Sequence, residues 1–291
     1  MTVDLTAPAV RAGAARRPWE RPAEFWPGMT HATTGWSAPV VALSLEALSH
    51  NAHDLLRRAG GLPIRVASKS IRARGVLDAV LALPGYRGVL AYTLAEALWL
   101  AETIDDVVVA YPTADHPALR LLGSDERAAN RVTVMVDSVD QLDLIDAAVA
   151  PSRRAAIRVC LDFDASWKAP VLGHVGVLRS PLHDAAALRA LAEEVLRREG
   201  FHLVGVMSYE AQIAGVADRP TGRPFTAAAL QAVQRISSHE LIERRARAIA
   251  EVRAIAHLEF VNGGGTGSVD RTVQDSAVTE VAAGSGLYGP H

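Results

Sequence analysis

Short apolar runs alternate with longer amphipathic stretches from Pro39 onward. The runs are rich in β-branched residues and are followed by polar residues or glycine, which is typical of buried strands. The predicted strands are 40–43, 64–67, 88–91, 107–110, 132–136, 156–161, 203–206 and 258–261, with 279–282 as a further short candidate. The stretches between them have the apolar spacing of helices. The predicted helices include 45–59 with Ser44 as its cap, 94–102, 139–149, 185–199, 227–254 and one that ends at 83.

Strands that alternate with helices in this way predict parallel βαβ units. About eight such units over about 250 residues match the size of a closed (β/α)8 barrel. An open, doubly wound sheet would show the same alternation, but no G-x-G-x-x-G follows the first predicted strand. We therefore expect an α/β protein whose residues 37–285 form a (β/α)8 barrel of the TIM type.

Residues 1–36 do not follow this rhythm and are predicted to form an N-terminal arm. Pro18, Pro22 and Pro27 are expected to break any helix there. Four aromatic side chains in the segment indicate an arm that packs on something rather than a disordered tail. They are Trp19, Phe25, Trp26 and Trp36.

Composition and charge narrow the class of protein. The 291 residues are 49% hydrophobic and 21% charged, as in ordinary globular proteins. The formal net charge is -2, from 30 basic and 32 acidic residues, so nothing indicates a nucleic-acid or membrane partner. The basic cluster Arg244-Arg245-x-Arg247 falls in a helical pattern and is interpreted as a solvated helix face.

The cysteine content and the absence of long apolar segments indicate the cellular compartment of the protein. Cys160 is the single cysteine, so no internal disulfide forms. No stretch approaches the ~20 apolar residues of a membrane span, and the N-terminus lacks the apolar core of a secretory signal. A cytoplasmic protein is predicted.

Candidate chemistry gathers where the predicted strands end. In a barrel, ligands bind at the carboxyl ends of the strands, so the residues that follow them share one rim. The residues expected there are mostly polar. They are Lys69, Tyr92, Tyr111, Asp137, Asp162, Ser208, Tyr209, Glu210 and the loop Gly263–Ser268.

Lys69 directly follows an apolar strand and is flanked by Ser68 and Ser70. A lysine that is desolvated, or that lies beside other cations such as Arg72 and Arg74, can lose its proton and form an imine with an aldehyde. A solvated lysine at the start of a helix is the plain alternative.

The loop Gly263–Ser268 contains four glycines, a threonine and a serine. Such a loop can turn several N–H groups toward one anion, which predicts a phosphate cradle, although Gly/Ser-rich loops also form ordinary turns. It lacks the lysine of a G-x-x-x-x-G-K-[ST] loop. An imine-forming lysine and a phosphate cradle on one rim together indicate pyridoxal phosphate as the cofactor.

Two further residue patterns give weaker evidence of a functional site. His50-x-x-His53 lies on a predicted helix without an evident third ligand, so it is interpreted as a surface face. Ser208 stands in M-S-Y-E rather than G-x-S-x-G, which argues against a serine hydrolase. No metal site is predicted in this chain.

From about Pro39 to its end, the chain resembles the alanine-racemase-type barrel (fold type III) of pyridoxal-phosphate enzymes. Within that family it is most similar to the branch of D-threonine aldolases, D-serine dehydratases and related amino-acid deaminase/aldolases. Six motifs in the family's order carry the resemblance. They are R-V-A-S-K-S-I-R (65–72), A-Y-T-L-A-E-A (91–97), H-V-G-V-L-R-S-P (174–181), G-V-M-S-Y-E-A-Q (205–212), V-N-G-G-G-T-G-S (261–268) and V-A-A-G-S-G-L-Y-G (281–289).

The resemblance implies a role for each matching position. Lys69 would form the imine with the cofactor, and the loop residues Gly264, Gly265 and Thr266 would donate to its phosphate. The remaining positions would assist at the phosphate or lie near the ring. They are Gly176, Val177, Arg72 and Tyr288 at the phosphate and Tyr209 near the ring.

Two departures from the family pattern change what is expected. Racemases of the family place an arginine against the pyridine nitrogen, where this chain has His174. Relatives also continue into a C-terminal β-domain that supplies metal ligands, and residues 286–291 stand where it would begin. The chain is therefore expected to be a fragment or a barrel-only protein, with a divalent metal only if such a domain exists, and a homodimer is among the assemblies implied.

The function predicted first is a pyridoxal-phosphate-dependent lyase for β-hydroxy amino acids, either an aldolase or a dehydratase-type deaminase. As a barrel alone it could be inactive. A racemase, which needs a second base, and a non-catalytic carrier of the cofactor are the alternatives. Glu210 is a candidate second base, or else a structural carboxylate paired with an arginine of the rim.

Overall fold

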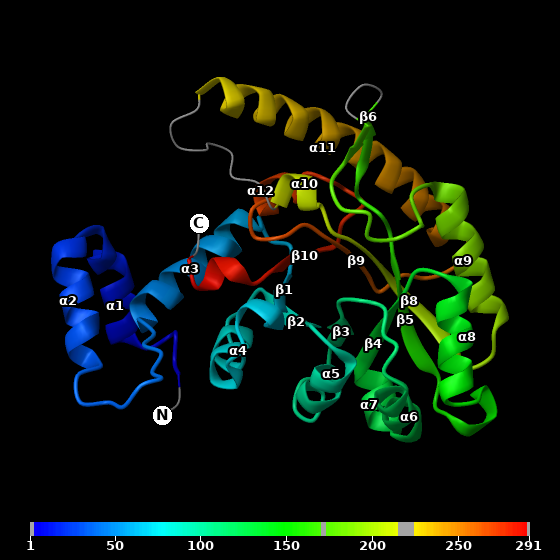
Figure 1. Ribbon diagram of the computed structural model, residues 1–291, viewed down its shortest axis with the longest axis horizontal. Helices are drawn as coiled ribbons and strands as arrows, with labels where there is room; N and C mark the ends of the chain where they lie inside the picture. The colour runs from blue at the N-terminus through cyan, green and yellow to red at the C-terminus, as the bar shows by residue number, and fades with distance from the viewer. Residues whose placement is uncertain (1–2, 170–172, 215–223, 290–291) are drawn as a thin grey trace.

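Eight parallel strands close into a barrel in the computed structural model, which describes residues 3–169, 173–214 and 224–289 (Figure 1). The strands are β1 (Ile64–Ala67), β2 (Tyr86–Ala91), β3 (Val107–Val109), β4 (Val132–Val136), β5 (Ile157–Asp162), β8 (Phe201–Ser208), β9 (Phe260–Gly263) and β10 (Glu280–Ala283). They pair in the circular order β1, β10, β9, β8, β5, β4, β3, β2. The predicted (β/α)8 barrel is confirmed.

Helices surround this barrel (Figure 1). Ser44 caps α3, because its hydroxyl accepts a hydrogen bond from the Ala47 N–H at 3.2 Å, as predicted. The main helices are α3 (Leu45–Arg58), α4 (Arg74–Leu81), α5 (Leu94–Leu100), α6 (His116–Ser124), α7 (Glu126–Arg131), α8 (Val139–Ala148), α9 (Ala185–Arg197) and α11 (Pro224–Arg253). The short elements are α10 (Ala211–Ala214), α12 (Val269–Thr272), η2 (Ser68–Ser70), η3 (Pro151–Arg153) and η4 (Ser285–Leu287). Searched over its described residues, the chain has no helix that combines the length and the apolar character of a membrane span.

The predicted interruption between β5 and α9 contains an antiparallel hairpin. Its strands are β6 (Trp167–Ala169) and β7 (Gly173–Val175), and Lys168 pairs with His174. Residues 170–172 between them lie outside the described part of the chain.

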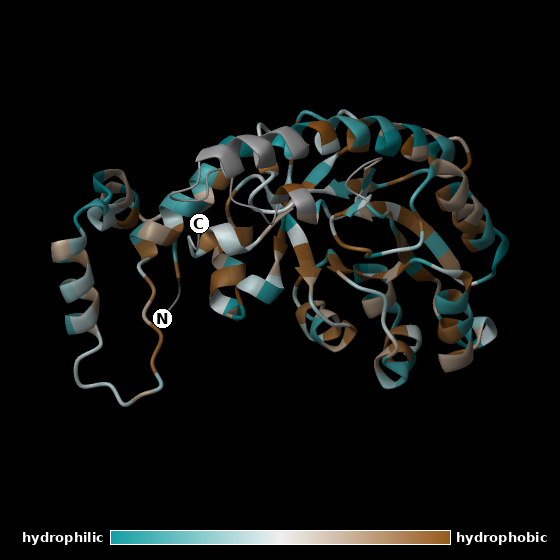
Figure 2. Cartoon of the chain, turned by 45° about the horizontal axis from the view of Figure 1, so that its top comes forward, coloured by the Kyte–Doolittle hydropathy of each residue, from teal (hydrophilic) through white to brown (hydrophobic). Residues whose placement is uncertain are grey.

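One predicted strand is wrong. The run 40–43 belongs to no strand, and Val41 is 96% exposed. Both sides of β1 are already taken, because Ile64 pairs with Val281 of β10 and with Tyr86 of β2. The eighth strand is β10, which the sequence offered only as a further short candidate. Figure 2 shows the run as a hydrophobic segment leading into α3, away from the barrel.

Apolar side chains pack in two layers on opposite faces of the strands. Along β3, Val107 and Val109 join the large cluster between strands and helices, whereas Val108 belongs to a smaller cluster. Because successive strand residues point to opposite faces, the smaller cluster fills the barrel interior. Its members are Val108, Met135, Cys160, Val204, Met207 and Phe260.

The first residues form three helical segments beside α3 (Figure 1). They are α1 (Pro8–Arg16), η1 (Pro18–Glu20) and α2 (Pro22–Ala32). The expectation that proline breaks helices here is wrong for Pro22, which begins α2, and for Pro27, which lies inside it. Proline is tolerated in the first turn, and α2 buries no residue, so water can reach the carbonyl that Pro27 leaves without a donor.

The domain limits at residues 36 and 285 stay predictions. The last barrel strand ends at Ala283, and η4 follows it. Of the expected C-terminal segment 286–291, residues 290–291 lie outside the described part of the chain.

Candidate active site

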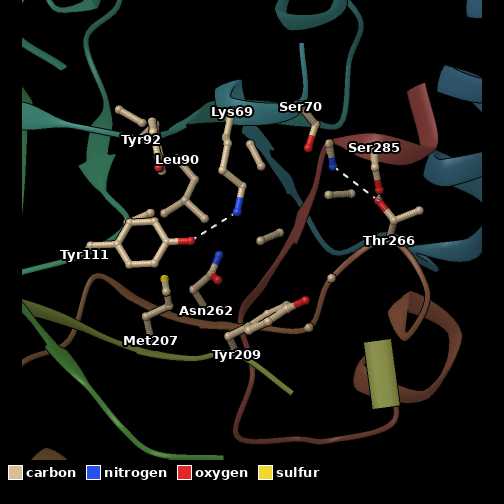
Figure 3. Close-up of a pocket in the computed structure, with 18 of the residues that line it drawn as sticks. Lys69, Ser70, Leu90, Tyr92, Tyr111, Met207, Tyr209, Asn262, Thr266 and Ser285 are labelled. Carbon is tan, nitrogen blue, oxygen red and sulfur yellow. Dashed lines mark hydrogen bonds between the residues drawn. The ribbon is translucent and has the colours of Figure 1, made fainter. Parts of the chain in front are cut away.

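A pocket opens at the end of the barrel where the strands finish (Figure 3). Its walls come from the ends of β1, β2, β3, β8, β9 and β10 and from the residues that follow them. Parallel barrels bind ligands at this end, so this pocket is the candidate active site.

Lys69 enters the pocket from η2, directly after β1. Its Nζ donates to the hydroxyl of Tyr111 at 3.1 Å and lies 5.9 Å from the ring centre of Tyr92. Figure 3 shows the amine pointing into the open pocket. Lys69 and Lys168 are the two lysines of the whole sequence, and Lys168 lies on the β6 hairpin outside the pocket lining.

Arg179 places a second cation beside the same tyrosine. Its guanidinium lies 4.6 Å from the ring centre of Tyr111 and donates to the carbonyl of Ala110. Its Nε forms an ion pair with the buried carboxylate of Asp162 at 2.8 Å. Burial raises the pKa of Asp162 to about 7, against the opposing effect of the Arg179 charge.

The pKa of Tyr111 is set by opposing effects. Partial burial acts to raise it, but the hydrogen bond and charge of Lys69, with the charge of Arg179, outweigh burial and lower it. The pocket therefore contains a tyrosine that ionises more readily than usual, next to an amine.

The glycine loop after β9 contacts the turn after β10, and its role as a phosphate cradle stays a prediction. The hydroxyl oxygen of Thr266 accepts from the N–H groups of Gly284 at 3.3 Å and Gly286 at 3.1 Å, and the Ser285 hydroxyl donates to it at 3.1 Å. Three donors thus converge on one oxygen. Such a cluster of donors also suits an oxygen of a phosphate.

Two glycines in these turns leave no room for a side chain. Gly264 has a φ of +77°, and a Cβ there would lie 2.7 Å from the Thr272 hydroxyl. A Cβ on Gly284 would lie 2.6 Å from the carbonyl oxygen of Ala67. Close packing of the backbone therefore sets the position of the donors.

A buried ion network supports the loop from below. Arg245, 1% exposed, donates to Glu210 at 2.6 Å and to Asp275 at 2.7 Å. Glu210 also accepts from the Thr272 hydroxyl at 2.8 Å. The interpretation of Glu210 as a structural carboxylate paired with an arginine therefore agrees with its contacts.

The interpretation of Arg244 and Arg245 as a solvated face is wrong. Both are buried, and Arg244 donates to the carbonyls of Asp164 and Ser166 at 2.8 Å. Arg245 points inward to Glu210, which follows β8, and to Asp275, which follows α12. Arg244 points inward to the two carbonyls and also pairs with Glu240 of its own helix. Arg247, two positions on, is exposed.

A second network of hydrogen bonds and ion pairs runs through the barrel interior. Asn262 at the pocket floor donates to Glu280 at 2.8 Å, and Glu280 accepts from Arg65 at 2.6 Å. Arg65 also pairs with Asp106 at 2.7 Å and lies over the ring of Phe260. This network links Asn262 at the pocket floor to Asp106, which precedes β3.

The predicted site residues fall into two groups. Lys69, Tyr209, Gly264, Gly265 and Thr266 line the one pocket. The others lie outside its lining, and their assigned roles stay predictions. They are Arg72, which is exposed with a φ of +53°; His174, Gly176 and Val177, which are exposed on or after β7; and Tyr288, whose hydroxyl donates to the Ile71 carbonyl at 3.0 Å.

Several pocket residues were not assigned a role from the sequence. Asn262 stands directly before the glycine loop, and Ser285 lies in the last matched motif, so position alone could have indicated both. Arg179 stands in the matched motif 174–181, but its place in the pocket depends on the path of the chain after β7.

A parallel barrel with an amine, a cluster of anion donors and aromatic walls in one rim pocket defines a class. It is the class of (β/α)8 barrels that bind a small molecule at the strand ends. The chain belongs to the alanine racemase N-terminal domain family, whose model matches residues 43–291. This is the fold type III family of pyridoxal-phosphate enzymes, as the sequence motifs predicted.

Individual relatives share this barrel. D-threonine aldolase of Arthrobacter sp is 26% identical over 202 residues, which are 69% of this chain and 47% of that protein. The crystal structure of D-threonine aldolase from Filomicrobium marinum matches with a TM-score of 0.66 and 20% identity, over 86% of this chain and 62% of that one. A metal-free mutant of D-threo-3-hydroxyaspartate dehydratase matches with a TM-score of 0.63 and 24% identity, over 87% and 62%.

The chain therefore spans about half the length of the curated relative, of which it covers 47%, and 62% of each of the two structures. At these identities the structural matches show the fold alone.

Proposed function

We propose that this chain binds pyridoxal phosphate and acts as a lyase on β-hydroxy amino acids. The observation that carries the proposal is that Lys69 and the Thr266 cradle line one pocket. An amine and a cluster of anion donors are the two anchors that a phosphorylated aldehyde needs. The donor set of the pocket thus fits the cofactor.

Each residue has a role that follows from its position. Lys69 would hold the aldehyde of the cofactor through its Nζ, and its free amine would accept a proton. Gly264, Gly265, Thr266 and Ser285, which line the pocket, would hold the phosphate, and Tyr209 would form a wall beside the ring. The bound cofactor supplies an electron sink for the electrons released when a bond at the substrate Cα breaks.

The choice of reaction rests on the relatives. A D-threonine aldolase and a D-threo-3-hydroxyaspartate dehydratase are both named for hydroxy amino acids, which supports a small-molecule substrate of that class. Within the described residues no group of three His, Cys, Asp or Glu is placed to hold a metal ion. A metal held by a C-terminal domain stays a prediction, as do a homodimer and a cytoplasmic location.

A racemase is the alternative that the family match favours. It would need a second base, and Glu210 is held by Arg245 and Thr272 beneath the loop. A non-catalytic carrier would use the same two anchors without turnover.

Covalent capture of the cofactor tests the first part of the proposal. The chain is incubated with pyridoxal phosphate, reduced with borohydride and digested, and the modified peptide is found by mass spectrometry. Modification of Lys69, lost in Lys69→Ala and kept in Lys168→Ala, is expected. Because these are the two lysines of the sequence, the second variant is a matched control. Equal labelling of both variants would refute the assignment.

Product analysis then separates the reactions. The loaded chain is given D-threonine or D-serine, with and without a divalent metal. Glycine with an aldehyde indicates aldol cleavage, and pyruvate or 2-oxobutanoate indicates dehydration. Exchange of the α-proton with inversion would favour the racemase, and binding without any of these would favour the carrier.

A further inference from the structure

The Tyr111 hydroxyl is an acid–base group within hydrogen-bond distance of the proposed attachment point. It accepts a hydrogen bond from Lys69 Nζ at 3.1 Å, and Figure 3 shows the two side chains meeting in the open pocket. Among the described residues, this is the hydrogen bond found for the Lys69 amine. The ring of Tyr111 is held edge-on against Tyr92, with the ring centres 5.9 Å apart.

Two cations face this phenol from different elements. Lys69 comes from η2, and Arg179 comes from the segment after β7 and lies 4.6 Å from the ring centre. Asp162 is engaged by Arg179 at 2.8 Å rather than by the phenol. The titratable and charged groups that face Tyr111, directly or through Arg179, are Lys69, Tyr92, Arg179, Tyr209, Asp162 and Asp137.

We propose that Tyr111 is a proton-transfer residue of this site and that its partner is the Lys69 amine. A proton of the Lys69 ammonium moves to the Tyr111 phenolate, so one N–H bond breaks and one O–H bond forms. A cation and an anion become a neutral amine and a neutral phenol, and no further reactant is needed. The neutral amine is the form of lysine that attacks an aldehyde.

The electrostatics of the pocket favour the phenolate, which is the form of Tyr111 that can accept a proton. Although partial burial opposes it, Lys69 and Arg179 lower the pKa of Tyr111, so its phenolate forms closer to neutral pH than that of an ordinary tyrosine. The other candidates are engaged elsewhere. Glu210 is paired with Arg245, and Asp162 with Arg179.

The first experiment needs no cofactor. Tyrosinate formation is followed by ultraviolet absorbance as the pH of the isolated chain is raised. One of the five tyrosines is expected to ionise before the rest, to vanish from the titration in Tyr111→Phe and to remain in Tyr92→Phe. In Lys69→Met the early ionisation should move to higher pH, because one of the two cations is gone. An unchanged titration in Tyr111→Phe would overturn the proposal.

The second experiment tests whether the proton transfer speeds the reaction of Lys69 with the cofactor. It rests on the proposed function. The rate at which Lys69 captures pyridoxal phosphate is measured across pH by borohydride quenching and mass spectrometry. Tyr111→Phe should slow capture by about 10²-fold near neutral pH. Tyr86→Phe, which removes a hydroxyl outside the pocket lining, should stay near the unsubstituted rate. Incorporation of 3-fluorotyrosine at position 111 should move the pH midpoint of capture downward, because its phenol is more acidic. A merely structural role would not move the midpoint.

The outcomes separate the two proposals. Capture at Lys69 that is equally fast in Tyr111→Phe would overturn the role of Tyr111 and leave the cofactor assignment standing. If Lys69 captures no cofactor in any variant, the proposed function fails, and the tyrosinate titration alone decides whether Tyr111 is paired with Lys69. Circular dichroism of Tyr111→Phe checks that the barrel remains folded.

Discussion

Arg179 contacts groups from three separate parts of the chain at the pocket wall. Its guanidinium contacts Asp162 on β5, the Ala110 carbonyl after β3 and the rings of Tyr111 and Tyr209. A carboxylate buried without such a partner would cost several kcal/mol. The ion pair therefore fixes a cation beside the pocket while it lessens the cost of burying Asp162.

The ionisation of Asp162 should make the stability of the folded chain depend on pH. Burial raises its pKa to about 7, above the usual value near 4, so the folded state holds this proton more tightly than the unfolded state. Its contribution to the free energy of unfolding is complete below about pH 4 and is lost as the pH rises through about 7. In Asp162→Asn that loss should disappear.

Urea unfolding at a series of pH values measures the effect. Between about pH 4 and pH 7, the unsubstituted chain should lose roughly 2–4 kcal/mol more of its free energy of unfolding than Asp162→Asn does. Asp140→Asn, which removes an exposed carboxylate, controls for the change in charge. Parallel curves for the unsubstituted chain and Asp162→Asn would show that burial does not control this group.

At the scale of elements, α11 shows what periodicity can and cannot predict. The helix was expected over 227–254 and extends over Pro224–Arg253. Which of its arginines point inward was not predictable, because the partners of Arg245 lie 30 and 35 residues away, at Asp275 and Glu210. A basic cluster on a helix has the same pattern whether it meets water or buried carboxylates.

Removal of Arg245 should therefore be costly. Arg245→Met leaves Glu210 and Asp275 buried without their cation, which should lower the free energy of unfolding by about 3–5 kcal/mol. Arg247→Ala, on the same helix but exposed, should stay within about 0.5 kcal/mol. Denaturant unfolding followed by circular dichroism compares the two. Equal losses would mean that helix propensity, and not the buried network, decides the outcome.

A glycine on β8 tests the fit between neighbouring strands. A Cβ on Gly205 would lie 2.4 Å from the ring of Phe260 on β9, so Gly205→Ala should destabilise the barrel by about 1–3 kcal/mol. Gly75 on α4 has nothing within 4 Å of its Cβ position, and Gly75→Ala should stabilise by about 0.5–1 kcal/mol. Thermal unfolding should thus move in opposite directions for the same chemical change, and a shared direction would contradict this account.

At the scale of the whole molecule, the alternation and number of strands and helices, with no G-x-G-x-x-G after the first predicted strand, favoured a closed barrel over an open sheet. That pattern misplaced one strand, because an apolar run such as 40–43 does not specify its neighbours. The true eighth strand begins with Glu280, a polar residue that is buried because Arg65 and Asn262 meet it inside the barrel.

The residues of the candidate site also divide into those that the sequence could predict and those whose position depends on the fold. Lys69 and the loop around Gly264 were predictable because each directly follows a strand, and strand ends converge whatever the loops do. Arg179 and the backbone donors of the η4 turn depend on how their segments return to the rim. His174 was assigned a place near the cofactor by its motif, yet it lies exposed on the β6 hairpin. Loop paths are set by tertiary contacts that a motif does not encode.

The N-terminal segment shows how far the single hydrophobic core extends. Leu5 is 1% exposed and belongs to the same apolar cluster as the barrel helices, and its carbonyl accepts from the Ser49 hydroxyl of α3 at 3.2 Å. Trp26 on α2 is larger but 62% exposed. If burial in the shared core decides stability, the smaller residue matters more.

Leu5→Ala should therefore lower the free energy of unfolding of the whole chain by about 2–5 kcal/mol, because it leaves a cavity between the N-terminal segment and α3. Trp26→Ala should change it by no more than about 0.5 kcal/mol. Denaturant unfolding followed by both circular dichroism and tryptophan fluorescence distinguishes the alternatives. Coincident transitions that shift together in Leu5→Ala would show that the segment unfolds with the barrel. A fluorescence transition that separates from the circular dichroism transition would show instead that the segment opens independently, and the loss on removing Leu5 would then be confined to it.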